Sequence, residues 1–441
     1  MVNSLLNRLV RTVVPLPNEA ARASRQARRV IDTWRELLSN RGEVSGAAVA
    51  HEALNAYREL PVAARPAFFT QLATAFAPDS GAVRAACEAY MADSSLAKLS
   101  QLQAIAASPL QKLSQRLNQT PGGTATLIDV RKHVIAGLDE HPEWKIIDAV
   151  LGRLFNSWFN RGFLTLQRID WHTPAFVLEK LIEYEAVHEI SGWRDLRRRL
   201  QSDRRCFAFF HPALPDEPLI FIEVALVKGI SSAVQPLLAL DAPVASAEKA
   251  DTAVFYSITN CQPGLRGVSF GNMLIKQVAQ RLGEEFPRIK TFSTLSPIPG
   301  FTAWLAHSAA DIKAQNVLAA INALSTPDWH QQPALAESMK KMLLPLCAYY
   351  LTTALHDGEP ADPVARFHLG NGARAERLNW LADTSARGLK NCAGLMVNYV
   401  YHLDQIEDNH EVYVREHRVA ATHEIRRLAR ECVLANPTRK T

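Results

Sequence analysis

Apolar residues in the first third of the chain recur at spacings of three and four positions. Phe68, Leu72 and Phe76 form one such series, and residues 96–105 hold another. This spacing places the apolar side chains on one face of a helix. We therefore expect residues 24–119 to form amphipathic helices.

Pro121-Gly122-Gly123 interrupts this helical pattern. Both residue types break helices, so the chain turns there. Further helices are expected at 126–136 and 144–158. The first part of the chain, residues 1–162, is thus predicted to be an all-helical bundle.

After Arg161-Gly162 the pattern changes to short, largely apolar runs separated by turn residues, which is typical of strands. Such runs occur at 207–210, 219–227, 253–258 and 290–294, the first two separated by a Pro-rich turn, and a helix is expected at 273–282. The predicted fold class is α+β. A mixed α/β domain over residues 163–441 follows the helical domain.

Length and composition agree with two domains, because 441 residues of which 48% are hydrophobic exceed the size of one ordinary core. The longest apolar runs, such as 219–227, fall well short of the roughly 20 residues that a membrane-spanning helix needs. We expect a water-soluble protein with no membrane partner.

The formal net charge of +5 is modest for this length, so a nucleic-acid partner is not expected. The basic residues gather only at Arg197-Arg198-Arg199 and Arg204-Arg205. We expect these arginines to form a solvated helix face, with a phosphate-binding patch as the alternative.

Six cysteines lie far apart without a CxxC pair, which indicates neither a zinc site nor a disulfide framework. Cys261 is expected to be a small buried apolar residue, with a reactive thiol as the alternative. His211 and Glu223 lack the spacing of metal ligands. No metal is expected.

The first 29 residues carry six arginines and a single acid, Glu19, which resembles a transit peptide. The alternative is a basic first helix, which we favour because the helical pattern continues through Ile31 and Trp34. The final residues lack the Ser-Lys-Leu peroxisomal signal. A cytoplasmic location is expected, with the mitochondrion as the alternative.

Two segments could bring a hydroxyl and an imidazole together. Residues 292–301 contain Ser296, with Ser293 as a second candidate, and residues 367–373 contain His368. Both segments are punctuated by Pro or Gly and are expected to be rigid turns. Taken alone, Ser296 before a proline is an ordinary turn residue, His368 a structural histidine and Tyr401 a core residue.

The glycine-rich loop 262–272 follows an expected strand and precedes a helix. Backbone N–H groups there could bind a phosphate at the helix N-terminus. The alternative is an ordinary strand-to-helix turn.

The same loop also matches the G-x-S-x-G motif of α/β-hydrolases, with Ser269 as nucleophile. Asp383 and His402 have the chain order that such an enzyme requires. Against this hypothesis, the alternation of many parallel strands with helices is missing from the pattern.

Several long motifs together resemble the malonyl-CoA decarboxylase family, over most of the chain from Trp158 to Tyr401. They are 255–258, the loop through Gly271, 286–287, 295–301, 367–373 and 394–401. The resemblance implies a GNAT-type acyltransferase fold for the catalytic domain and a homo-oligomer that acts on malonyl-CoA.

The resemblance also implies that the loop after the third strand holds coenzyme A. The GNAT pattern Arg/Gln-x-x-Gly-x-Gly/Ala aligns with this loop, except that Ser269 stands where the pattern has glycine. The implied binding residues are Arg266, Gly267, Val268, Ser269, Phe270, Gly271 and Asn272. This alignment also offers an explanation of the G-x-S-x-G match as a coincidence.

By the same resemblance, Ser296 and His368 form the catalytic pair, with Tyr401 nearby as a supporting polar group. A serine hydroxyl can bind a carboxylate, and a histidine can donate a proton at neutral pH. No cofactor is expected, since coenzyme A is part of the substrate. An acyltransferase and a catalytically silent acyl-CoA-binding regulator remain alternatives.

Overall fold

In this computed structural model, the described residues are 17–38, 43–268, 274–308, 315–356, 358–432 and 434. They form two compact units. The first comprises the chain up to Leu164 together with the segments His211–Pro215 and Gln262–Ser269, and the second comprises the rest. The expected domain boundary after residue 162 stays a prediction, because compactness alone does not show where an independently folding domain ends.

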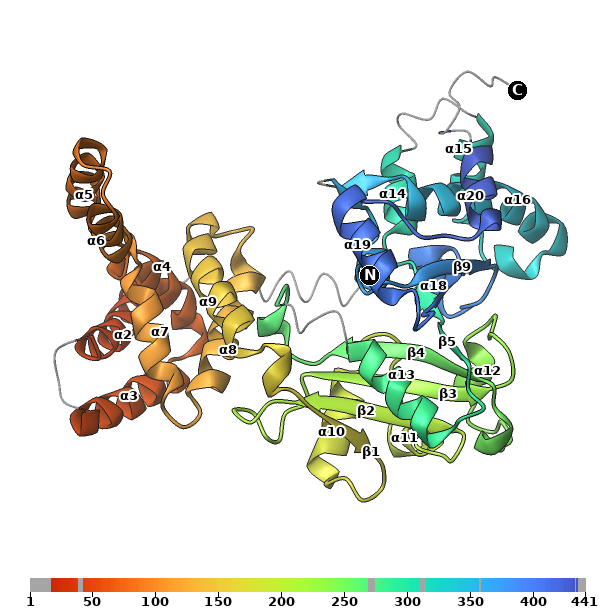
Figure 1. Cartoon of the computed structure of the whole chain (residues 1–441), viewed down its shortest axis with the longest axis horizontal. Helices are drawn as coiled ribbons and strands as arrows, with labels where there is room; N and C mark the ends of the chain where they lie inside the picture. The colour runs from red at the N-terminus through yellow and green to blue at the C-terminus, as the bar shows by residue number, and fades with distance from the viewer. Residues whose placement is uncertain are drawn as a thin grey trace. The chain divides into compact units, whose positions relative to one another are not determined.

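The first unit is helical, as the apolar spacing predicted (Figure 1). Its core is rich in aromatic rings. The rings of Trp34 and Phe68 pack edge to face with their centroids 5.0 Å apart, and those of Phe69 and Trp144 do so with centroids 5.1 Å apart. The chain turns between α7 and α8 at Pro121-Gly122, where Gly122 takes a left-handed φ of 76°, and Gly123 is the first residue of α8. The helices are α2 (Pro17–Glu36), α3 (Glu43–Arg58), α4 (Arg65–Ala75), α5 (Ser80–Ala92), α6 (Leu96–Ala106), α7 (Pro109–Asn118), α8 (Gly123–Gly137) and α9 (Lys145–Trp158).

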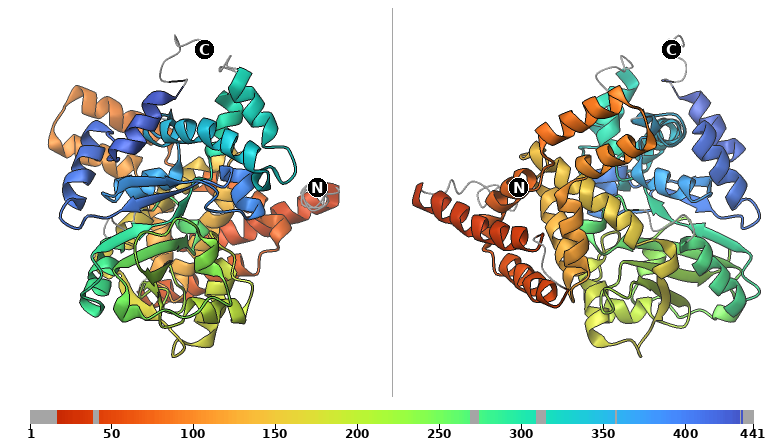
Figure 2. Two further views of the ribbon diagram at one scale, coloured as in Figure 1. Left: turned by 90° about the vertical axis from the view of Figure 1, so that its right-hand side faces the viewer. Right: turned by 60° about the vertical axis from the view of Figure 1, so that its left-hand side comes forward.

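The second unit is built on an eight-stranded sheet in the described residues, with the order β1-β2-β3-β4-β5-β10-β6 and β9 paired to β10. The later strands, blue in Figure 2, extend the sheet that the earlier green strands begin. The strands are β1 (Thr165–Ile169), β2 (Arg204–Phe210), β3 (Ile220–Val227), β4 (Thr252–Asn260), β5 (Thr291–Thr294), β6 (Ser296–Pro297), β9 (Arg374–Asn379) and β10 (Met396–Val400). A separate hairpin joins β7 (Leu355–His356) to β8 (Glu359–Pro360).

Neighbouring strands of the sheet are antiparallel except β4 and β5, which are parallel and are connected through α13 (Leu274–Glu285). The four strands expected from sequence correspond to β2, β3, β4 and β5. This topology confirms the α+β class and the GNAT-type catalytic domain. The pattern did not reveal β1, β6, β9 and β10, which are short or partly polar.

Helices cover both faces of the sheet (Figure 1). Apolar side chains of α10 (Ala175–Tyr184) and α11 (Trp193–Arg199) pack on Cys206 and Ala208 of β2, while α13 lies beside Phe207, which points to the opposite face. Cys261 is buried in the α10–α11 core, which confirms its interpretation as a small apolar residue. The remaining helices are α12 (Gln235–Leu238), α14 (Phe301–Ser308), α15 (Gln315–Ala323), α16 (Pro333–Thr352), α17 (Pro363–Gly370), α18 (Ala386–Cys392), α19 (Ile406–Glu416) and α20 (His423–Glu431).

The prediction of a solvated arginine face was wrong. Of the five arginines, Arg198, Arg199, Arg204 and Arg205 are buried, and only Arg197 is exposed. Arg198 donates two hydrogen bonds to Asp203, and Arg205 pairs with Glu285 at 2.7 Å. These cations are already satisfied by carboxylates, so they are neither a solvated face nor a free phosphate patch.

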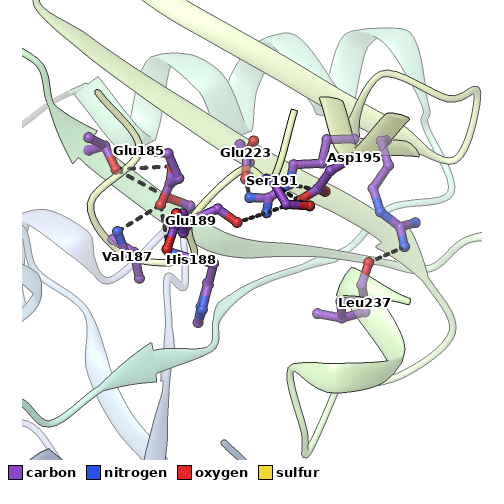
Figure 3. A network of polar contacts seen from close by, with 12 residues as sticks. Glu185, Val187, His188, Glu189, Ser191, Asp195, Glu223 and Leu237 are labelled. Atoms are coloured by element: carbon purple, nitrogen blue, oxygen red, sulfur yellow. Dashed lines mark hydrogen bonds and ion pairs between the residues drawn. The ribbon is translucent and has the colours of Figure 1, made fainter. Parts of the chain in front are cut away.

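Among the described residues, Arg199 has three partners in this buried polar network, and Figure 3 labels them as Glu189, Asp195 and Glu223. Its guanidinium donates to Asp195, to Glu223 and to the Glu189 carbonyl. Glu185 belongs to the same region and accepts hydrogen bonds from the hydroxyls of two β4 residues, Ser257 and Thr259. The network therefore fixes the chain after α10 against the middle of the sheet.

Candidate active site

The structure brings Ser296 and His368 together, although they are far apart in sequence. The hydroxyl oxygen of Ser296 lies 3.0 Å from Nε2 of His368, and both side chains are buried. The expected meeting of hydroxyl and imidazole is thus confirmed as geometry. The segments are not two turns, however, since Ser296 opens the short strand β6 and His368 lies in the last turn of α17.

Local sequence explains both positions. Ser296 pairs with Val397 of β10, and Pro297 then ends the strand after two residues. Asp362 caps the N-terminus of α17, and Pro363 occupies its first position, where a proline is favourable. The helix then carries the imidazole to the sheet.

Tyr401 completes the group, because its hydroxyl lies 2.7 Å from Nδ1 of His368. It follows β10 directly and is buried, with burial raising its pKa well above the ordinary value. Burial also lowers the pKa of His368 to about 3. At neutral pH the imidazole is therefore uncharged and the phenol keeps its proton.

Thr294, two residues before Ser296, connects the serine to the sheet. Its Oγ1 accepts the Ser296 hydroxyl at 2.9 Å and the backbone N–H of Tyr399 at 3.1 Å. Asn398 in turn donates to the Thr294 carbonyl at 2.7 Å. Sequence reasoning missed these two polar residues, since only their place next to Ser296 and Tyr401 in sequence could have drawn attention to them.

Two proton arrangements fit the contacts of His368 with Ser296 and Tyr401. In the first, Ser296 donates to Thr294, Nε2–H of His368 donates to Ser296, and Tyr401 donates to Nδ1. In the second, Ser296 donates to Nε2, and Nδ1–H donates to Tyr401. Both leave His368 neutral, so the buried resting site carries no charge on the imidazole.

Ser293, the second candidate hydroxyl, donates to the Thr294 carbonyl at 3.0 Å. No hydrogen bond among the described residues joins it to His368. The geometry therefore favours Ser296.

The predicted coenzyme A loop is described only in part. Arg266 and Gly267 are exposed, Gly267 has a left-handed φ of 77°, and Val268 is buried. Residues 269–272, which include Ser269, Phe270, Gly271 and Asn272, lie outside the described residues. The assignment of this loop to coenzyme A stays a prediction.

The hydrolase hypothesis gains no support from the described residues. Asp383 accepts hydrogen bonds from Gln235 and from the backbone of Ser385. Nε2 of His402 is buried and has no hydrogen-bond partner in the part of the chain that the structure describes. Among the described residues, Asp383 and His402 therefore do not make the Asp–His hydrogen bond that a catalytic triad needs.

Within the described ranges, no group of three or more His, Cys, Asp or Glu side chains could hold a metal ion. Among the helices seen there, none combines the length and hydrophobicity needed to cross a membrane. The expected lack of a cofactor, the cytoplasmic location and the homo-oligomeric assembly stay predictions.

The sheet, with its parallel pair β4–β5 connected through α13, gives the second unit the GNAT-type topology. The family model for the malonyl-CoA decarboxylase C-terminal domain matches residues 162–439, and the model for the N-terminal domain matches residues 76–159. The chain belongs to the malonyl-CoA decarboxylase family. It is accordingly a carboxy-lyase.

Individual relatives agree with this membership. The mitochondrial malonyl-CoA decarboxylase of Anser anser anser is 37% identical over 341 residues, covering 71% of this chain and 68% of the relative. The crystal structure of malonyl-CoA decarboxylase from Rhodopseudomonas palustris is 47% identical with a TM-score of 0.87, covering 91% of this chain and 99% of the other. The structure from Agrobacterium vitis is 45% identical with a TM-score of 0.84, at the same coverage.

Proposed function

We propose that the chain decarboxylates malonyl-CoA to acetyl-CoA and CO2, with Ser296 and His368 as the catalytic pair and without a metal ion or organic cofactor. The observation that carries the proposal is the 3.0 Å contact between Ser296 Oγ and His368 Nε2 in a buried site. Membership of the malonyl-CoA decarboxylase family supports the substrate. Coenzyme A is then part of the substrate.

The reaction requires stabilisation of a negative charge and the delivery of one proton. When the bond to the carboxylate breaks, its electron pair passes to the carbon next to the thioester, and an enolate forms as CO2 leaves. The thioester carbonyl accepts the charge itself, which is the chemical reason that we propose no metal. A proton then adds to the carbon, so each turnover consumes one proton.

In this proposal Ser296 binds the malonyl carboxylate through its hydroxyl, and His368 delivers the proton. Before substrate binds, burial holds the pKa of His368 near 3 and the ring is neutral. A carboxylate beside the ring favours the protonated imidazolium, so substrate binding raises this pKa. Tyr401 contacts Nδ1 and keeps Nε2 directed at Ser296.

We assign the loop from Arg266 to Asn272 to the pyrophosphate of coenzyme A. Arg266 is exposed and supplies a positive charge, while the left-handed Gly267 turns the backbone. Backbone N–H groups ahead of a helix N-terminus are suited to bind phosphate oxygens.

The test is release of CO2 from malonyl-CoA by the purified chain, with three variants measured in parallel. We expect His368→Ala and Ser296→Ala each to lower kcat about 10²- to 10⁴-fold, the range for loss of a general acid or base. Ser269→Ala is expected to retain turnover, whereas a Ser269-dependent hydrolase would lose it.

Absence of CO2 release by the wild-type chain, with coenzyme A binding intact, would overturn the proposal. Transfer of the acyl group to an added acceptor would then identify an acyltransferase. Binding without any turnover would identify a silent regulator.

A further inference from the structure

Asp362 is a buried carboxylate at the start of the helix that carries His368. Its side chain is completely buried, and Oδ1 accepts the backbone N–H groups of Val364 and Ala365, each at 2.9 Å. These are two of the N–H groups that have no partner within a helix. Asp362 thus fixes the first turn of α17, and His368 lies six residues later in the last turn.

Asp362 also lies against the segment that carries Ser296. A Cβ atom added to Gly300, four residues after Ser296, would lie 3.8 Å from Oδ2 of Asp362 and 2.3 Å from the hydroxyl oxygen of Tyr350. Only a glycine therefore lets this backbone approach so closely. Burial raises the pKa of Asp362 to about 6, and the backbone N–H groups of Ala365 and Val364 oppose that rise.

The second oxygen of this carboxylate is not otherwise used. Oδ2 of Asp362 is buried and has no hydrogen-bond partner among the described residues. A buried polar atom without a partner destabilises the fold, and an asparagine would cap α17 about as well without an ionisable group. Capping alone does not explain an aspartate at this position.

We propose that Asp362 is a positioning residue, which holds Ser296 and His368 at hydrogen-bonding distance by joining the Gly300 segment to the N-terminus of α17. The inference rests on the proposed function, because it concerns the same catalytic pair. Asp362 itself does not contact the imidazole and acts through α17.

The test separates capping from positioning by two substitutions. Asp362→Asn keeps an oxygen that caps α17 but replaces the other oxygen with an N–H donor facing Gly300, whereas Asp362→Ala removes both. We expect both variants to lose about 10²-fold in kcat with little change in KM, because the reacting groups are displaced by about 1 Å. Only the alanine variant should show a clear fall in Tm.

Asp79→Ala is the matched control, since Asp79 caps α5 in the helical unit by accepting the Ala82 N–H at 2.6 Å. It should lower Tm as a lost cap does, without lowering kcat. A kcat for Asp362→Asn equal to that of the wild type would show that Asp362 is only a helix cap and would overturn the inference.

A crystal structure of Asp362→Asn gives a readout that does not depend on turnover. The Ser296 Oγ to His368 Nε2 distance, 3.0 Å in the wild type, should exceed about 3.5 Å, beyond hydrogen-bonding range. An unchanged distance would contradict the inference. If the wild type releases no CO2, the proposed function fails, and this distance still decides the role of Asp362.

Discussion

The ring of Tyr399 lies face to face with the imidazole of His368, with ring centroids 4.7 Å apart and an interplanar angle of 26°. Its backbone N–H donates to Thr294, which also accepts the Ser296 hydroxyl. One residue of β10 therefore contacts both halves of the catalytic pair, through its ring on one side and its backbone on the other.

Substitution of Tyr399 should separate the role of its ring from that of its hydroxyl. The hydroxyl is buried without a hydrogen-bond partner in the described residues, so Tyr399→Phe removes an unsatisfied group and should keep kcat and Tm close to wild type. Tyr399→Leu removes the stacked ring and should lower kcat about tenfold or more, because the imidazole loses the surface that orients it.

Steady-state kinetics and thermal unfolding of the two variants check this prediction. A large loss of kcat in Tyr399→Phe would show that the hydroxyl, and not the ring, is the important group.

The site residues were predicted from the long motifs shared with the family, and not from the local pattern of apolar and polar residues. The apolar periodicity located the helices of the first unit and four strands of the sheet, yet it could not show that Ser296 and His368 meet. Their contact requires β6 and α17 to converge beside β10, which is set by long-range packing. The family resemblance supplied this pairing, while Thr294, Asn398 and Tyr399 lacked any signal of their own.

Loss of the Tyr401 hydroxyl should affect the chemical step. Tyr401→Phe removes the 2.7 Å contact to Nδ1 of His368 while keeping the ring. We expect kcat to fall roughly 10²-fold, since the orientation and proton exchange of the imidazole are lost. KM should change little, because the hydroxyl faces the side of the ring away from Ser296.

The kcat and KM values of Tyr401→Phe provide the check. A rise in KM with unchanged kcat would instead place Tyr401 in substrate binding.

Two buried histidines should make the fold sensitive to acid. Burial lowers the pKa of His368 to about 3 and that of His188 to about 4, whereas an unfolded histidine has a pKa near 6.5. Between pH 6.5 and these lower values the unfolded chain binds protons that the folded chain does not. The free energy of unfolding should therefore be largest above pH 6.5 and fall as the pH decreases toward 4.

Urea unfolding from pH 7.5 to 4.5 checks this sign. His188→Gln and His368→Gln should each make the pH dependence shallower, and His172→Gln, whose side chain is 98% exposed, should leave it unchanged. An equal slope in all four proteins would contradict the prediction.

The arginine cluster shows that the charge pattern of neighbouring residues in sequence does not predict whether a side chain is exposed. Arg205 pairs with Glu285 and Arg199 with Glu223, and both carboxylates lie on other elements of the chain. A run of arginines looks solvated when only its sequence neighbours are considered. The fold supplies the compensating charges, so the cluster becomes part of the core.

Removal of Arg199 should strongly destabilise the second unit. Its guanidinium is bonded to Asp195 and Glu223, and burial already raises the pKa of Glu223 against the opposing charge of Arg199. Arg199→Met leaves these carboxylates buried without their cation, which should cost about 3–5 kcal/mol of unfolding free energy.

The matched control is Arg194→Ala, because Arg194 and Asp241 form an ion pair with side chains 74% and 90% exposed. That loss should stay below about 1 kcal/mol, because water already solvates both groups. Urea unfolding at pH 7.5 measures both values, and a similar small loss in the two variants would mean that the buried network does not stabilise the sheet.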